Sequence, residues 1–187
     1  AMSKLSGEKK VINNFSKSVI LKPSIVYSVD DNFTTNFMRL LSILPIMPLY
    51  YKGKTKFTPI HVSDFVDIIF KIVQNKITRE TIECIGPEVL TFKEIILKIL
   101  KSINKKRLLI PLPMSLAKIN AKLFQLMPKP LLTIDQLKLL KYDNIVSKKF
   151  KTNFDIGMEA KKKFDEEINH YSFNWTSGGQ FSKGKNK

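Results

Sequence analysis

The sequence predicts an α/β fold, because short apolar runs rich in β-branched residues alternate along it with longer stretches of helical periodicity. The chain has 187 residues, of which 43% are hydrophobic, and this is enough to bury one substantial core. The alternation and the apolar content together favour a globular domain built around a parallel sheet.

A helix, a strand and a second helix are expected in the first third of the chain. The first helix covers residues 3–15, and its apolar side consists of Leu5, Val11, Ile12 and Phe15. Residues 18–21 follow as a nearly wholly apolar strand, as expected of a strand buried on both faces, and Pro23 ends it because proline has no N–H for the ladder. Residues 30–32 then offer a cap for the second helix, whose apolar residues are Phe33, Phe37, Leu40 and Leu41.

The central part of the chain repeats the order of strand and helix twice. Residues 58–62 are a predicted strand, after which Ser63 is expected to cap a helix with an apolar face of Phe65, Ile68, Ile69, Ile72 and Val73. Residues 80–85 are the next predicted strand. Thr91 and Glu94 have the spacing of a capping box, and they open a helix with an apolar face of Ile95, Ile96, Ile99, Leu100 and Ile103.

The last part of the chain changes in character after about residue 145. Before that point a strand is expected over residues 107–112. Three further segments are expected to be helical, namely 114–126, 133–141 and 159–171. From residue 176 onward the glycine, serine and lysine content predicts disorder. We therefore expect a packed unit over residues 1–145 and a basic, partly helical tail over residues 146–187, disordered at its end.

The formal net charge of +16 indicates attraction to phosphate polyanions or to anionic lipid headgroups. Of the 32 basic residues, however, the only arginines are Arg39, Arg79 and Arg107. The planar guanidinium, which reads base edges and binds phosphate in bidentate fashion, is therefore nearly missing, and the lysines are spread along the chain. No specific nucleic-acid partner is expected.

Cys84 is the only cysteine, so neither a disulfide framework nor a cysteine zinc site is expected, and a reducing compartment is favoured. Its position within the strand of residues 80–85 predicts a thiol packed in the core rather than a nucleophile. No metal site is predicted. The longest uncharged stretch, residues 40–51, is too short to span a bilayer and contains Pro45 and Pro48, so no transmembrane segment is expected.

The opening residues, Ala1 to Glu8, resemble the segment that follows the active-site tyrosine of short-chain dehydrogenases, where Tyr-x-x-x-Lys is often followed by x-x-Gly-Glu. Lys4 stands at the lysine position, and the tyrosine would fall one residue before Ala1. The resemblance implies a catalytic and cofactor-binding role for Lys4. In that role its ammonium lowers the tyrosine pKa and binds the nicotinamide ribose hydroxyls, while the phenol acts as general acid or base. Taken alone, Lys4 also fits an ordinary surface lysine.

The strand that follows carries a second part of the resemblance. Residues 19–27 read Val-Ile-Leu-Lys-Pro-Ser-Ile-Val-Tyr and resemble the family's apolar strand ending in Arg-Pro-x-x-Val-Tyr-Gly. In the family the backbone after this proline lies along the nicotinamide carboxamide. The residues implied to contact the cofactor are Pro23, Ser24 and Ile25. Lys22 replaces the arginine and Ser28 the glycine, which weakens the expectation of ordinary dehydrogenase activity more than that of the fold.

Longer blocks narrow the resemblance to the extended, atypical branch with NAD-dependent epimerases and dehydratases, which includes the NADPH-binding accessory subunit of mitochondrial respiratory complex I. These blocks are residues 53–64, 85–94, 108–113 and 132–144. The first ends in Pro-x-x-Val-x-Asp, where Asp64 is expected to be structural and His61 a strand residue rather than a catalytic base.

The resemblance implies the C-terminal part of a Rossmann-like, doubly wound parallel sheet with a small α/β subdomain on the substrate side. It assigns residues 1–145 to the C-terminal portion of an NAD(P)-binding domain plus this subdomain. The seven glycines form no Gly-x-x-Gly-x-x-Gly turn, and the phosphate-cradling turn needs such glycines at a helix N-terminus. Binding of NADP or NAD is therefore expected to require a missing N-terminal part, and this chain alone is expected to be inactive.

Two functions follow from the resemblance. The first is a non-catalytic, dinucleotide-binding protein of a membrane-associated respiratory or quinone-related complex, cytoplasmic or peripheral at the inner membrane surface. The alternative is an active NAD(P)-dependent oxidoreductase or epimerase that acts on a small carbonyl or sugar-nucleotide substrate. The residue before Ala1 would bear on this choice, because the first function tolerates loss of the tyrosine and the second does not.

Overall fold

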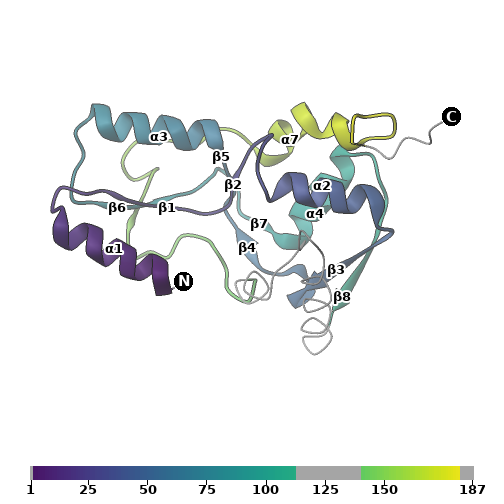
Figure 1. Ribbon diagram of the computed structural model, residues 1–187, viewed down its shortest axis with the longest axis horizontal. Helices are drawn as coiled ribbons and strands as arrows, with labels where there is room; N and C mark the ends of the chain where they lie inside the picture. Colours follow the sequence, from purple (N-terminus) through teal and green to yellow (C-terminus); the bar gives the residue numbers. More distant parts are fainter. Residues whose placement is uncertain (1, 113–139, 182–187) are drawn as a thin grey trace.

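The computed structural model describes residues 2–112 and 140–181, in which helices and strands alternate (Figure 1). The helices are α1 (Met2–Asn14), α2 (Thr34–Ile43), α3 (Val62–Gln74), α4 (Phe92–Ser102) and α7 (Phe164–Ser172), with the 3-10 helices η1 (Tyr51–Gly53) and η2 (Phe173–Trp175). The strands are β1 (Ile20–Pro23), β2 (Val26–Tyr27), β3 (Ile46–Tyr50), β4 (Lys56–Phe57), β5 (Ile60–His61), β6 (Thr81–Cys84), β7 (Leu90–Thr91), β8 (Leu108–Leu112) and β9 (Lys151–Thr152). The helices expected over residues 114–126 and 133–141 lie outside these ranges, except for residues 140 and 141, which form a turn. None of the helices in the two ranges is long and apolar enough to cross a membrane.

A three-stranded parallel sheet forms one end of the molecule, with the strand order β1-β6-β9. α3 lies on one side of this sheet and α1 on the other, so that the sheet is the middle of three layers (Figure 1). A parallel sheet between two helical layers is the arrangement of doubly wound α/β folds. The predicted α/β class with a Rossmann-like parallel sheet is confirmed.

The two faces of this sheet differ in polarity. The core on the α3 side includes Leu21, Ile60, Ile68, Ile72, Ile82 and Cys84. On the side of α1, Lys22 and Glu83 are partners in the β1–β6 register, and Lys22 forms an ion pair with Glu8 of α1. The prediction that the apolar run of β1 is buried on both faces is therefore wrong. All four residues of β1 are only partly buried, because one face of the strand packs against a polar layer.

A larger core fills the other end of the molecule, where α2, α4 and α7 pack together. α4 buries its whole predicted apolar face, namely Ile95, Ile96, Ile99, Leu100 and Ile103. The predicted capping box is confirmed, since the Thr91 hydroxyl accepts the Glu94 N–H at 3.2 Å and the Glu94 carboxylate accepts the Thr91 N–H at 2.7 Å. At the start of α2, the Asp31 carboxylate accepts the N–H groups of Phe33 and Thr35, as expected of this polar segment.

Three two-stranded sheets complete the fold. β2 pairs with β5 and β3 with β8, both parallel, while β4 and β7 are antiparallel. The sequence predicted β8 but not β3, in which Pro48 lies opposite Ile110. Proline is tolerated in β3 because this strand has a partner on one side only in the part of the chain that the structure describes, so that the missing N–H faces the open edge.

The segment after residue 145 is packed into both cores. β9 extends the three-stranded sheet, and the larger core receives the side chains of Phe164, Ile168, Tyr171 and Trp175. The change in composition therefore marks a more charged surface and not the end of the packed structure. Residues 176–181 form a turn in which the Phe181 N–H donates to Asn174 and the Phe181 ring lies 5.1 Å from Trp175. The disorder predicted from residue 176 onward stays a prediction, and residues 182–187 lie outside the described ranges.

Candidate functional site

The candidate site lies at the carboxyl end of β1. In parallel α/β sheets, ligands bind in the crevice outside the carboxyl ends of the strands. Pro23 is the last residue of β1 and lies opposite Cys84, the last residue of β6. The predicted cofactor-contacting residues, which begin at Pro23, therefore leave the sheet at the edge where a Rossmann-like fold would bind a dinucleotide.

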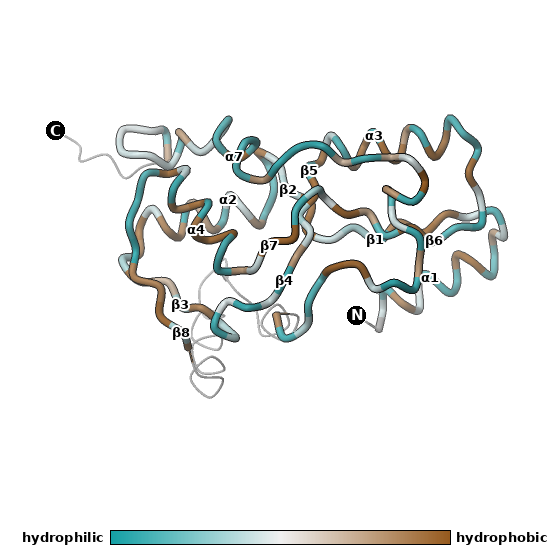
Figure 2. The backbone as a smooth tube through the Cα atoms, turned by 180° about the vertical axis from the view of Figure 1, so that it is seen from behind, coloured by the Kyte–Doolittle hydropathy of each residue, from teal (hydrophilic) through white to brown (hydrophobic). Residues whose placement is uncertain are grey.

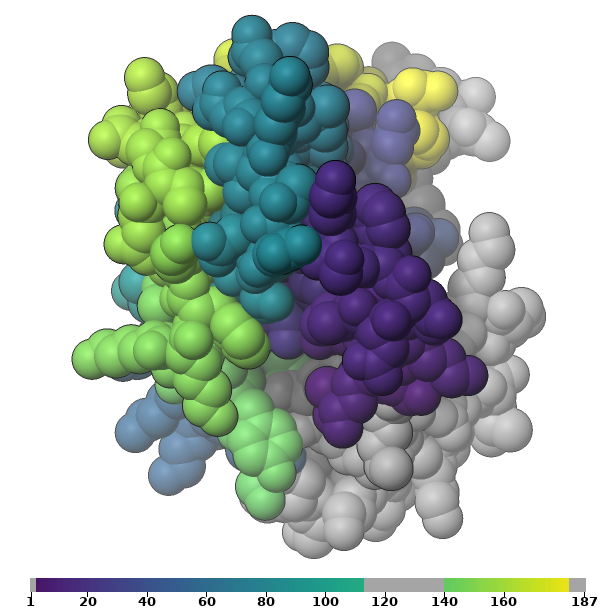
Figure 3. Space-filling model, turned by 90° about the vertical axis from the view of Figure 1, so that its left-hand side faces the viewer, coloured from purple at the N-terminus to yellow at the C-terminus, as the bar shows by residue number. Residues whose placement is uncertain are grey.

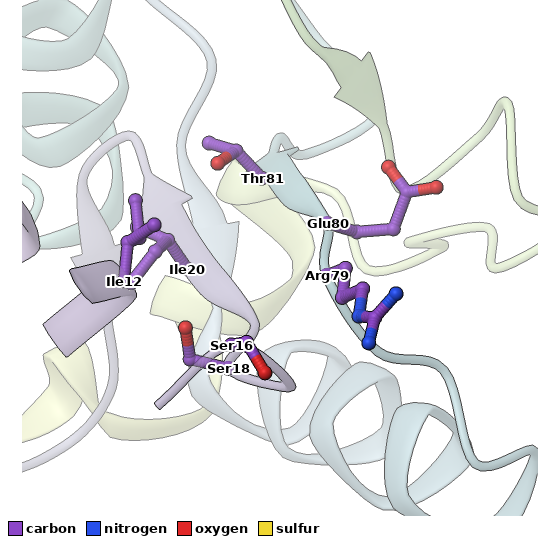
Figure 4. A pocket seen from close by; sticks show the side chains of 7 residues that line it. All are labelled: Ile12, Ser16, Ser18, Ile20, Arg79, Glu80 and Thr81. Carbon is purple, nitrogen blue, oxygen red and sulfur yellow. The ribbon is translucent and has the colours of Figure 1, made fainter. Parts of the chain in front are cut away.

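α1 brings Lys4 to the same edge. Ile12 of α1 and Ile20 of β1 lie together on one side of a shared cavity (Figure 4), and Glu8 binds Lys22 with 2.8 Å between Oε2 and Nζ. One helical turn, about 5.4 Å, advances α1 by nearly the same length as two strand residues, about 6.6 Å. α1 and β1 run in opposite directions (Figure 1), so that Lys4, one turn before Glu8, lies nearer the carboxyl end of β1 than Glu8 does.

Lys4 is exposed and forms no ion pair within residues 2–112 and 140–181. Lys22, at the position of the family's arginine, is instead held by Glu8, and its ammonium lies 4.8 Å from the centroid of the Phe150 ring. Glu8 was visible in the sequence as part of the Lys-x-x-Gly-Glu segment. No sequence motif pointed to Phe150, because only the folded chain brings this residue next to β1.

Ser24 fixes the backbone that follows Pro23. Its N–H donates to the Cys84 carbonyl at 3.2 Å, and its hydroxyl donates to the Asn144 carbonyl at 2.9 Å and accepts the Thr58 N–H at 3.2 Å. The Ile25 carbonyl accepts the N–H of Ile60 at 2.9 Å. These bonds tie the segment to β6, β5 and the residues around Asn144, so that its course past the end of β1 is rigid.

Ile25 itself is half-buried and packs against the larger core. Its side chain therefore points into the protein, and any cofactor contact from this residue would come from its backbone. The structure brings three of the predicted residues, Pro23, Ser24 and Ile25, together in one segment. It places Lys4 on the neighbouring helix.

A cavity of about 250 Å³ lies between α1 and the sheet (Figure 4). Its lining residues are Ile12, Ser16, Ser18, Ile20, Arg79, Glu80 and Thr81. Ser18 and Thr81 stand at the amino ends of β1 and β6, so the cavity opens at the edge opposite to Pro23. It is therefore separate from the candidate dinucleotide edge.

His61 and Asp64 have structural roles at the start of α3. His61, not the predicted Ser63, is the N-cap of this helix, because its Nδ1 atom accepts the Ser63 N–H at 3.3 Å. The Asp64 carboxylate accepts the N–H groups of Lys161 and Lys162, both at 2.9 Å. It thus ties α3 to the segment that leads into α7, in agreement with the predicted structural role.

A buried polar cluster surrounds His61. The ring packs edge-on against Tyr27 at 5.2 Å, and its Nε2 atom lies 3.7 Å from the Glu167 carboxylate. Burial lowers the pKa of His61, and the opposing effect of Glu167 is smaller. Burial also raises the pKa of Tyr27 far above its usual range. A neutral histidine and a neutral phenol enclosed in this way are suited to packing rather than to proton transfer with a bound substrate.

The prediction for Cys84 is confirmed. Its side chain is fully buried in β6, and burial raises the pKa of the thiol to about 12. Residues 2–112 and 140–181 contain no group of three or more histidine, cysteine, aspartate or glutamate side chains that could hold a metal ion.

The fold resembles that of Rossmann-fold, nucleotide-sugar enzymes of known structure. The UDP-glucose 4-epimerase of Thermus thermophilus, solved with NAD, has a TM-score of 0.59 and 15% identity, over 91% of this chain and 50% of that one. The dTDP-4-dehydrorhamnose reductase of Clostridium acetobutylicum has a TM-score of 0.58 and 16% identity, over 91% and 53%. The class of fold is therefore that of NAD(P)-binding epimerases, dehydratases and reductases.

The chain is similar in sequence to accessory subunits of mitochondrial complex I. It is 24% identical, over 84% of its length, to the NADH-ubiquinone oxidoreductase 40 kDa subunit of Neurospora crassa. It is also 24% identical, over 78% of its length, to the NADH dehydrogenase [ubiquinone] 1 alpha subcomplex subunit 9 of Arabidopsis thaliana. The resemblance inferred from the sequence blocks is thereby confirmed. The chain spans 41% and 39% of these two relatives, and no family model matches it.

The residues at the carboxyl edge fit one end of a nicotinamide dinucleotide. Lys4, which has no ion pair among the described residues, could offer its ammonium to ribose hydroxyls, and the segment after Pro23 could offer a rigid backbone. None of the glycines in the described residues stands in a strand-to-helix turn that could cradle a pyrophosphate. The edge could therefore contact the nicotinamide end of a cofactor, while the phosphates would need another part of the fold.

Proposed function

We propose that this chain is the C-terminal part of an NAD(P)-binding accessory protein of a respiratory complex of the complex I type. In this role the dinucleotide stabilises the fold, and the protein has little turnover of its own. The protein lies at the membrane surface through its partners. The similarity to the two mitochondrial subunits along most of the chain supports this function over that of a free enzyme.

The observation that carries the cofactor part of the proposal is the packing of α1 against β1. Ile12 and Ile20 line one cavity, and the ion pair of Glu8 with Lys22 links α1 to β1 one turn nearer the N-terminus of the helix. Lys4 lies one further turn in that direction, and a lysine near the carboxyl end of a strand in a parallel sheet would suit the nicotinamide ribose of a dinucleotide.

The state of Lys22 supports a structural rather than a catalytic use of the cofactor. Its ammonium is already engaged by the Glu8 carboxylate and by the Phe150 ring. A cation neutralised in this way contributes little to the charge at the edge. Lys4 is then the one residue of the two that faces a cofactor with an unpaired charge, within the described part of the chain.

The test uses the complete gene product that contains these residues, purified from its membranes. We expect it to copurify with the respiratory complex and to release NAD(H) or NADP(H) on denaturation, as measured by chromatography of the supernatant. Lys4→Ala should lower the retained dinucleotide about tenfold, the effect of losing one charge-assisted hydrogen-bonding group. Lys10→Ala, an exposed lysine about 120° around α1 from Lys4, is the matched control and should retain the wild-type amount. A cofactor-free protein that stays in the soluble fraction would refute the proposal.

The second candidate is an active oxidoreductase or epimerase, favoured by the exposed and unpaired Lys4. This function predicts turnover of nucleotide-sugars or small carbonyl compounds by the complete gene product, followed by the absorbance of the reduced nicotinamide. Turnover that falls in Lys4→Ala and persists in Lys10→Ala would support it. Turnover that is equal in both variants would remove Lys4 from the reaction.

A further inference from the structure

The segment that follows β1 is fixed at both of its ends. Its first residues, Ser24 and Ile25, are held by hydrogen bonds to β6, β5 and the carbonyl of Asn144. Its last residues form a tight turn before α2. In this turn the Asp31 carboxylate accepts the Ser28 N–H at 3.0 Å, and the Asp31 N–H donates to the Ser28 carbonyl at 3.4 Å. The turn therefore sets the course of the backbone just beyond Ile25.

α7 holds this turn through one chain of hydrogen bonds. The Thr34 hydroxyl donates to the Asp31 carboxylate at 2.6 Å and lies 2.8 Å from the Tyr171 hydroxyl. Because the single hydroxyl proton of Thr34 is used on Asp31, the Tyr171 phenol is the donor in the second bond. Thr34 is fully buried and Tyr171 is 6% exposed. Burial also raises the pKa of Tyr171 far above its usual range, so the phenol keeps the proton that it donates.

The start of α7 and the residues before it hold the same segment at Tyr27. The Tyr27 hydroxyl donates to the Lys162 carbonyl at 3.3 Å, and the Tyr27 ring lies 4.9 Å from the ring of Phe164. The chain enters α7 through a hydrophilic stretch, and α7 lies beside α2 when the molecule is seen from the front (Figure 1) and from behind (Figure 2). Since Tyr27 and Ser28 are consecutive, α7 and the chain before it hold the segment at two adjacent points.

α7 is not close to the helix that carries Lys4. α1 lies in the foreground of Figure 3, with the yellow C-terminal residues behind it, and the two helices are also apart in Figure 1. A change in α7 therefore reaches the nicotinamide edge through residues 24–34 and not through α1. A backbone that is ordered before a ligand arrives loses less conformational entropy when the ligand binds.

We infer that Tyr171, acting through Thr34 and Asp31, is a positioning residue for the dinucleotide, because it holds residues 24–28 in the conformation that the nicotinamide end contacts. This inference rests on the cofactor part of the proposed function. The loss of one buried hydrogen bond corresponds to a change of about fivefold in binding. The coupling is reciprocal, so bound dinucleotide also stabilises the contact between Tyr171 and Thr34.

The test measures how fast bound NADPH or NADH leaves the complete gene product on dilution, followed by the nicotinamide fluorescence. Tyr171→Phe removes the hydroxyl and keeps the ring, and we expect release to be about fivefold faster. Thr34→Val should have the same effect, and the double variant should be no faster, because both substitutions break one chain of hydrogen bonds. Thr34→Ser retains the hydroxyl and should release the dinucleotide at the wild-type rate.

Two control variants separate positioning from a general loss of stability. Tyr50→Phe makes the same chemical change at a buried tyrosine whose hydroxyl has no hydrogen-bond partner within the described ranges. Ser172→Ala removes the bond of 3.1 Å from the Ser172 hydroxyl to the Ser102 carbonyl, which joins α7 to α4 and does not involve residues 24–34. Both controls should release the dinucleotide at the wild-type rate. Equal rates in Tyr171→Phe and Ser172→Ala would overturn the inference.

Amide hydrogen exchange distinguishes failure of this inference from failure of the proposed function. A wild-type protein that holds no dinucleotide would refute the proposed function, and the exchange of residues 24–31 then decides on Tyr171. Exchange there that is about fivefold faster in Tyr171→Phe than in Ser172→Ala would retain the positioning role. Equal exchange in the two variants would remove it.

Discussion

Glu8 and Lys22 join α1 to β1 through an ion pair with 2.8 Å between Oε2 and Nζ. The pair spans the polar layer between this helix and its sheet, and neither partner is buried, with exposed fractions of 29% and 32%. Partly exposed pairs of this kind contribute about 0.2–1 kcal/mol. The ion pair therefore contributes little to the attachment of α1 to the sheet.

Loss of this pair should have a small effect. We expect Glu8→Gln to lower the free energy of unfolding by no more than about 1 kcal/mol, measured by urea denaturation, because solvent screens both charges. High salt should reduce the difference from wild type. Lys9→Gln, a neighbouring exposed residue, is the control. A loss of several kcal/mol would mean that Glu8 does more than pair with Lys22.

Loss of the Asp64 carboxylate should be more costly. Asp64→Ala leaves the N–H groups of Lys161 and Lys162 without their charged acceptor in a partly buried setting, and we expect a loss of about 2 kcal/mol. Asp67→Ala, on the exposed side of the same helix, should cost less than about 0.5 kcal/mol. Urea denaturation of the two variants compares them directly, and equal losses would contradict the role assigned to Asp64.

Gly86 and Gly7 should respond to alanine in opposite directions. A Cβ atom at Gly86 would lie 1.7 Å from the Pro59 carbonyl oxygen, whereas one at Gly7 would meet nothing within 4 Å. We expect Gly86→Ala to cost more than about 3 kcal/mol, since backbone must move. Gly7→Ala should stabilise α1 by about 0.5–1 kcal/mol through helix propensity. Thermal melts of both variants test the pair, and an unchanged midpoint for Gly86→Ala would contradict the close approach.

Acid should weaken the junction around His61. Burial lowers the folded-state pKa of His61 below the usual value of about 6.5, so the neutral ring is favoured in the folded protein. Its contribution to stability is complete above that unfolded-state value and is lost as the pH falls through it toward the folded-state pKa.

The measurement is urea denaturation between about pH 7.5 and pH 5. We expect His61→Gln to have a shallower loss of stability over this range than wild type. His170→Gln, which leaves His61 in place, should keep the wild-type slope associated with His61. An identical pH dependence in wild type and His61→Gln would contradict the assignment.

Local signals in the sequence predicted the helices well. The capping box of Thr91 and Glu94 and the apolar face of α4 both depend on residues close in sequence, and both are present as expected. The cap of α3 shows the limit of such signals. Ser63 and His61 are both competent caps, and the course of β5 into the helix selects His61. β3 was not predicted, because a proline such as Pro48 argues against a strand unless that strand lies at the open edge of a sheet.

The candidate site was predictable in part. The order of Lys4 and Pro23 in the sequence indicated the carboxyl edge of the sheet as the site. The structure places the two residues on the neighbouring elements α1 and β1. The partners of Lys22 and Ser24 were not predictable, since Phe150 and Asn144 are distant in sequence and only the packing of the late segment brings them to β1. The polarity of the face between β1 and α1 was missed for the same reason.

The hydrogen bonds from Lys161 and Lys162 to Asp64 also affect the order in which the chain can fold during synthesis. α3 leaves the ribosome long before Lys161 and Lys162, whose N–H groups donate to the Asp64 carboxylate. The larger core is completed still later, when Phe164, Ile168 and Trp175 have been translated. At about 5–20 residues per second, the nascent chain carries both half-built cores for several seconds. α3 thus lacks these hydrogen bonds until Lys161 and Lys162 have been translated, and the half-built cores are vulnerable to proteases and to aggregation during that interval.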